Sequence, residues 1–99
     1  MVKYGNKNEL KIPPLAIKDP DAIEIIRVWI AKGKQEVCLK VGLWNDPVVW
    51  GRLLTDVARH IANVYAHAQK VDFDQVLDRI VEGFQAELDE PVDDSGVTL

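Results

Sequence analysis

Two histidines on one predicted helix come nearest to a catalytic arrangement. Asp56 and His60 are four residues apart, which places both side chains on one face of a helix, and Arg59 lies beside them. A carboxylate next to an imidazole can orient a general base, so these three residues are the candidates for acid–base catalysis. His67 lies about 10.5 Å further along the axis, too far for the two histidines alone to hold one metal ion. The alternative is a structural role, in which both imidazole rings pack at the border of the apolar stripe of the helix.

Other chemical signatures are missing from the sequence. Serine and threonine occur only at Thr55, Ser95 and Thr98, which argues against serine-type catalysis. The six glycines are dispersed and form neither a P-loop nor a dinucleotide-binding fingerprint. We therefore expect no cofactor and no metal site, and we favour a non-enzymatic function.

Chain length and charge restrict the kinds of protein and of partner that are compatible with the sequence. The chain has 99 residues and a formal charge of −4, divided into +3 over residues 1–52 and −7 over residues 53–99. This length allows one small domain, and self-association would enlarge its core. The negative charge argues against nucleic acid as a partner. With one cysteine, Cys38, no signal peptide and no transmembrane run, we expect a cytoplasmic protein with no membrane association.

The N-terminal half predicts an arm, a short helix and a β-hairpin. Residues 1–18 mix polar residues with two prolines and predict an extended arm, and Asp19-Pro20 predicts a helix over about 20–25. Apolar residues then alternate over 26–31 and again over 36–41, which predicts two strands around a turn at 32–35. We expect Ala31 opposite Glu36, with Gly33 supplying a positive φ in the turn.

The C-terminal half predicts two long helices. Asp46-Pro47 begins an apolar stripe that predicts a helix over 47–69, with Ala66 on its outward side. Asp72 and Gln75 form a capping box that begins a further helix, which Pro91 ends. The order is then α-β-β-α-α, an α+β fold in which the hairpin packs on two antiparallel helices. We assign residues 1–18 to the arm, 19–90 to the domain and 91–99 to a disordered acidic tail.

Trp29 marks the candidate binding surface. In the hairpin it shares a face with Arg27, Cys38 and Lys40, opposite the apolar face. A large indole on that face calls for a cover, for which the arm, a second copy of the chain and a bound ligand are the candidates. The alternative is that the Arg27 and Lys40 stems cover it themselves.

Several runs resemble a known family. They are Asp19-Pro20-Asp21-Ala22, the strand over 24–31, the run Trp44-Asn45-Asp46-Pro47 followed by Trp50-Gly51, and 58–62. These runs are similar to those of small bacterial proteins of about 100 residues, classed as a domain of unknown function. The pattern W-x-D-P-x-x-W-G is the most specific piece. The resemblance implies a free-standing bacterial domain and no particular chemistry.

The sequence therefore leaves two hypotheses. The first is a small homodimeric interaction module that binds a protein or a small molecule at the Trp29 face or the hairpin edge. The second is a small enzyme that uses His60 with Asp56 or Arg59 for acid–base chemistry.

Overall fold

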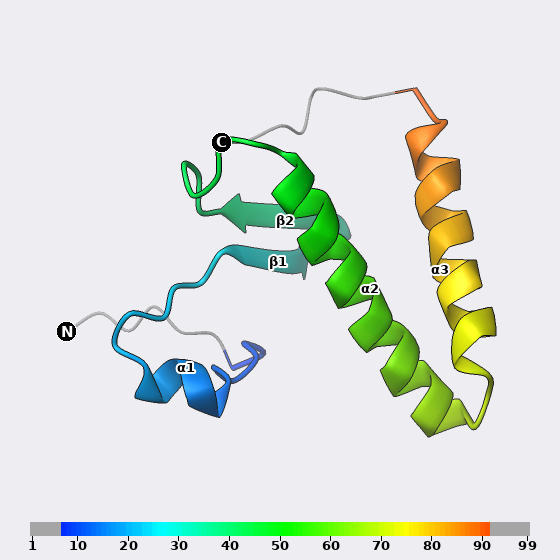
Figure 1. Ribbon diagram of the computed structural model, residues 1–99, viewed down its shortest axis with the longest axis horizontal. Helices are drawn as coiled ribbons and strands as arrows, with labels where there is room; N and C mark the ends of the chain where they lie inside the picture. The colour runs from blue at the N-terminus through cyan, green and yellow to red at the C-terminus, as the bar shows by residue number, and fades with distance from the viewer. Residues whose placement is uncertain (1–6, 92–99) are drawn as a thin grey trace. The chain divides into compact units, whose positions relative to one another are not determined.

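A computed structural model describes residues 7–91 of the chain. The predicted acidic tail therefore lies, apart from Pro91, outside the described residues. The element order is α1 (Pro14–Lys18), β1 (Ile26–Ala31), β2 (Lys34–Leu39), α2 (Val48–Gln69) and α3 (Phe73–Leu88), as Figure 1 shows. This order confirms the small α+β fold expected from the sequence. The chain forms two compact units, Met1–Lys40 and Val41–Leu99, and each is described by itself.

The short first helix lies earlier than predicted. It occupies Pro14–Lys18, inside the segment that we expected to be an extended arm, and Pro14 takes one of the first helical positions, where its fixed φ is suitable. Asp19 instead ends this helix and begins a turn, because its Oδ1 accepts a hydrogen bond of 2.9 Å from the Asp21 amide. Asp followed by Pro favours a turn as well as a helix start, and here the turn is formed.

The hairpin has the predicted faces but a different register. Val28 lies opposite Val37 and Ala31 opposite Lys34, so the register differs by two residues from our prediction. The turn contains only Lys32 and Gly33, with φ values of 52° and 73°, and positive φ at both positions is typical of a type I′ turn. A shift of two residues preserves which side chains share a face.

The two long helices begin at aspartates. Asp46 Oδ1 accepts a hydrogen bond of 3.0 Å from the Val48 amide, and Asp72 Oδ2 accepts one of 3.1 Å from the Gln75 amide. The second contact confirms Asp72 as the N-cap of α3. Lys70, in the left-handed region with φ of 54°, ends α2. The short turn that follows lets α3 run back along α2 (Figure 1).

Small residues form the inner side of α2. Ala62 is fully buried, and Ala58 and Ala66, one turn away on either side, are half-buried. Our placement of Ala66 on the outward side was therefore wrong, because alanine contributes little to a hydrophobic pattern although it allows two helices to approach closely. Of the larger residues in the predicted stripe, Trp50 is half-buried, whereas Ile61 is 43% and Val64 66% exposed.

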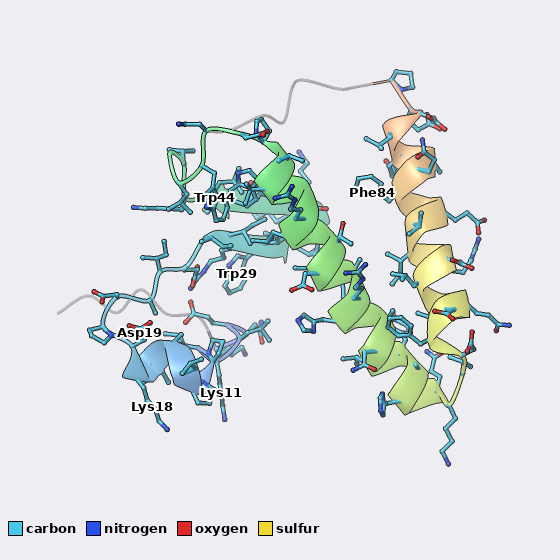
Figure 2. All side chains as sticks on the ribbon, viewed as in Figure 1. Lys11, Lys18, Asp19, Trp29, Trp44 and Phe84 are labelled. Atoms are coloured by element: carbon cyan, nitrogen blue, oxygen red, sulfur yellow. The ribbon has the colours of Figure 1, made fainter. Side chains whose placement is uncertain are left out.

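Helices α2 and α3 pack together near their connecting turn and diverge toward their other ends. The first two turns of α3 hold half-buried residues, whereas Phe84 and Leu88 near its C-terminus are 58% and 63% exposed. Figure 1 shows the two helices meeting at their connecting turn and standing apart at their other ends, and Figure 2 labels Phe84 in the open part. The unit of residues 41–99 therefore has its closest packing near the 70–72 turn.

Candidate functional site

The proposed acid–base residues lie on α2 and are exposed. Asp56, Arg59 and His60 all face solvent, and in the described part of the chain no hydrogen bond or ion pair joins them. His67 Nδ1 lies 2.9 Å from the Asn63 carbonyl oxygen, a bond within the helix. Helical spacing places these side chains on neighbouring positions without bringing them into contact. Their catalytic role stays a prediction.

The Trp29 face is formed by alternate residues of the hairpin. Arg27 lies opposite Cys38, and Trp29 lies opposite Glu36. Trp29 is half-buried although Cys38 across the ribbon is exposed. Lys40 continues the same face beyond β2, where its amide donates a hydrogen bond of 2.9 Å to the Ile25 carbonyl. The four residues expected to form a binding face are therefore on one side of the hairpin.

Arg27 connects this face to the arm. Its Nη1 donates to Glu9 Oε2 at 2.6 Å, while Nε and Nη2 donate to the two Glu24 oxygens at 2.6 and 3.0 Å. The bidentate contact with Arg27 lowers the pKa of Glu24, chiefly through these hydrogen bonds, and the two carboxylates raise the pKa of Arg27. Glu9 precedes Arg27 by 18 residues, so this ion pair holds the arm beside β1.

The arm and the strand enclose a pocket. Its volume is about 880 Å³, and Figure 2 shows Trp29 between β1 and the segment that carries Lys11. The pocket is lined by residues 8–13, Ala16, residues 22–24 and residues 26–30. Of its apolar side chains, Leu10 is 90% and Ile23 57% exposed. Residues 8–13 of the arm therefore line the same pocket as Trp29, and what covers the indole stays a prediction.

The pocket also reaches the outer edge of β1. Val28, Trp29 and Ile30 all line it, although consecutive side chains of a strand point to opposite faces. A pocket lined by three consecutive residues runs along the backbone of the strand. The outer edge is the side of β1 away from β2.

Backbone groups along that edge point outward. The hydrogen bond from Lys40 to Ile25 fixes the phase of the antiparallel ladder, in which paired and outward residues alternate. Arg27, Trp29 and Ala31 therefore pair with β2, whereas the amides and carbonyls of Val28 and Ile30 point away from β2. Among residues 7–91 no backbone hydrogen bond is formed by these outward groups.

The signal for this site was only partly visible in the sequence. The alternation over 26–31 identified the face of Trp29, but nothing local indicated that Glu9 would pair with Arg27. A smaller pocket of about 390 Å³ lies between α2 and α3 and was not predicted from the sequence. It is lined by Ile61, Tyr65, Gln69, Gln75, Val76, Arg79 and Ile80. Its residues come from two helical faces that only the packing of the pair brings together.

The tryptophans of the W-x-D-P-x-x-W-G run form a local contact. The Trp44 and Trp50 rings lie edge to face, with centroids 5.4 Å apart and planes at 78°. Asp46 between them accepts a hydrogen bond from the amide of Val48, the first residue of α2. The run therefore encodes the beginning of a helix with an aromatic pair beside it, and no reactive group is part of it.

These features define a small α+β protein with a largely apolar pocket beside a strand edge. The chain belongs to the family described as a domain of unknown function, DUF5076, whose model matches residues 9–92. A structure from the photosynthetic bacterium Rhodopseudomonas palustrus CGA009, described as a putative pyruvate dehydrogenase, is similar: it is 35% identical, has a TM-score of 0.74, and the match covers 100% of this chain and 99% of that chain. Comparison with curated proteins gave no match.

Two general properties complete the description of residues 7–91. No helix there has the length and apolarity needed to cross a membrane. No group of three or more His, Cys, Asp or Glu side chains gathers there in a way that could hold a metal ion.

Proposed function

We propose that the chain is a small interaction module that binds an extended, apolar segment of a partner protein along the outer edge of β1. The observation that carries this proposal is the pocket of about 880 Å³ lined by consecutive residues of β1, beside an edge at which Val28 and Ile30 form no backbone hydrogen bond among residues 7–91. Addition of a strand to such an edge is a common mode of peptide recognition, in which backbone hydrogen bonds supply affinity and side-chain pockets supply specificity.

The side chains around the edge favour an apolar peptide. Trp29 is half-buried and presents part of its indole, and Leu10, Ile12 and Ile23 are each more than half exposed on the walls of the pocket. An added strand would direct alternate side chains toward Trp29 and toward the face of Val28 and Ile30. Two rows of apolar contacts are thus available to one peptide.

The charged groups of the pocket restrict the ligand further. Arg27 already contacts the carboxylates of Glu9 and Glu24. An acidic side chain would have to displace one of them, whereas an uncharged peptide leaves the ion pairs intact. The proposed ligand is therefore apolar at alternate positions and carries no acidic residue near Arg27.

We propose also that the module is a homodimer. Among the described residues Ala62 is the only buried hydrophobic side chain, and many large apolar side chains are exposed. A small domain with so little buried surface gains stability by association with a second copy.

Proline substitutions at the two hairpin edges test the peptide-binding proposal. Val28→Pro removes an outward amide from the β1 edge, and Val37→Pro removes one from the β2 edge, and neither removes a bond between the strands. The probe is an array of capped octapeptides with apolar residues at alternate positions. Peptides bound by the wild-type chain should be lost with Val28→Pro and retained with Val37→Pro. Equal binding to both variants, or no peptide bound by the wild-type chain, would contradict the proposal.

A second candidate is an enzyme, favoured by the description of the similar structure as a putative pyruvate dehydrogenase. Its residues would be His60 with Asp56 or Arg59, which the structure leaves exposed and unjoined within residues 7–91. Titration with pyruvate, followed by the NMR shifts of the His60 ring and the Arg59 side chain, tests it. Saturable shifts that His60→Gln abolishes without loss of folding would favour the enzyme.

A further inference from the structure

The outer edge of β2 is the second unpaired edge of the hairpin. All six residues of β2 are exposed, and within the unit of residues 1–40 β1 is the element that contacts it. The ladder phase that directs Val28 outward on β1 directs Gln35, Val37 and Leu39 outward on β2. An exposed edge with unpaired amides and carbonyls can add a further strand.

A second copy of the same strand can pair with this edge only in certain registers. Two copies related by a two-fold axis pair antiparallel, so each register is defined by the residue that lies opposite itself. In a register centred between two residues, a residue whose amide and carbonyl point outward would lie opposite one whose amide and carbonyl point toward β1. The apolar face of one hairpin would also continue into the polar face of the other, so such a register is excluded. The pairing must therefore be centred on a residue, and the charged side chains of β2 decide which residue that is.

The charges favour a register centred on Cys38. That register places Glu36 of each copy opposite Lys40 of the other, which gives two symmetric pairs of opposite charge on the Trp29 face. It also places Val37 opposite Leu39 on the apolar face, where these side chains are 37% and 47% exposed. Lys34 lies opposite Gly42 and meets no like charge.

Neighbouring registers are less favourable. A centre at Val37 places Lys34 opposite Lys40, and a centre at Glu36 places two glutamates side by side. A centre at Gln35 pairs Lys34 with Glu36, but only residues 34–36 overlap before the Lys32-Gly33 turn. A centre at Cys38 overlaps residues 36–40, because Lys40 continues the ladder through its bond to Ile25.

We propose that two copies of the chain associate by antiparallel pairing of their β2 strands, with Cys38 opposite Cys38 and Glu36 opposite Lys40. The two hairpins then form one four-stranded sheet in which the β1 edges remain outermost. This interface is independent of the peptide site, because it uses the other edge of the hairpin.

Charge reversal tests the register directly in fully reduced protein, by sedimentation equilibrium. Lys40→Glu and Glu36→Lys each replace two attractive pairs with two repulsive ones, and we expect the dimer to dissociate roughly 10- to 30-fold more readily. The double variant Glu36→Lys/Lys40→Glu restores both pairs and should restore the dimer. Lys34→Glu is the matched control and should dissociate like the wild type.

Cross-linking tests the same register by distance. Cys38 would form a non-hydrogen-bonded pair with its copy, with Cα atoms about 4.5 Å apart, within the range that a disulfide spans. Diamide, which accepts the two electrons and two protons released by the two thiols, should then give a covalent dimer. A control chain with Lys34→Cys and Cys38→Ser should stay uncross-linked.

Several outcomes would overturn the proposal. The first is a wild-type chain that is monomeric at 100 µM, on the order of the concentration at which weak dimers are populated. The second is a dimer that neither single charge reversal weakens, and the third is a double variant that fails to restore association. The fourth is a chain with Lys34→Cys and Cys38→Ser that forms the cross-link. Retention of peptide binding by a monomeric Glu36→Lys chain would show that the β1 site does not depend on the β2 interface.

Discussion

Glu9 and Arg27 form an ion pair of 2.6 Å that fastens the arm to the first strand of the hairpin. Arg27 also holds Glu24 through two hydrogen bonds, so its guanidinium joins three parts of residues 1–40. The contact places the arm across the pocket in which Trp29 is half-buried. The shape of the candidate site therefore depends on one charged side chain at its border.

Loss of the arm contact should expose Trp29. Glu9→Gln removes the only carboxylate that the arm contributes to Arg27 among the described residues, so the arm should separate from β1. In a Trp44→Phe/Trp50→Phe background, the emission of Trp29 should shift to longer wavelength and become more accessible to acrylamide. Lys11→Gln, which removes a charge from the same arm, is the control and should leave the emission unchanged.

The Glu24 contact should weaken in acid. The folded-state pKa of Glu24 lies below the ordinary value of 4.5, so its contribution to stability is present above that value and is lost as the pH falls through the lowered pKa. The free energy of unfolding measured by urea between pH 6 and pH 3 should therefore fall more steeply in the wild type than in Glu24→Gln. Parallel curves for the two proteins would contradict this origin of the shift.

The buried alanine should resist enlargement. Ala62→Leu adds three carbons at a fully buried position of α2, and overpacking of this kind costs about 1–3 kcal/mol of unfolding free energy. Ala68→Leu lies at an exposed position of the same helix and should cost little. Urea denaturation of the two variants measures the difference, and equal stabilities would show that the surroundings of Ala62 have room for a larger side chain.

The cap of α3 should contribute measurably to stability. Asp72→Ala removes the acceptor of the Gln75 amide and should lower the free energy of unfolding by about 1 kcal/mol. Asp74→Ala removes an acidic residue from the first turn without removing a capping bond and should cost less. Thermal unfolding followed by circular dichroism should order the three proteins accordingly, and a reversed order would contradict the capping role.

The two long helices and the faces of the hairpin could be predicted from the sequence because periodicity and caps are local signals. The register of the hairpin could not be predicted, because the two-residue turn requires a positive φ at Lys32, which is not typical of lysine. Asp19-Pro20 suits a helix start and a turn equally, so the first helix was misplaced. Ala58 and Ala62 carry too little apolarity to show that they are more buried than larger residues of α2 such as Ile61.

The candidate site was predictable in part for the same reason. Alternation placed Trp29, Arg27 and Cys38 on one face, which the register confirms. The pairing of Glu9 with Arg27 spans 18 residues, and the outward amides of β1 depend on the phase of the ladder; neither follows from composition or spacing. The role of His60 stays a prediction that the exposed α2 surface does not test.

Amide hydrogen exchange along the hairpin tests the central claim most directly. With an alternating apolar octapeptide selected from the array, the outward amides of Val28 and Ile30 should exchange at least tenfold more slowly than in the free chain. The amides of Arg27 and Trp29, already paired with β2, and of Val37 on the opposite edge should change little. Protection confined to Val37, or exchange at Val28 and Ile30 unaffected by a saturating peptide, would show that the β1 edge is not the binding site.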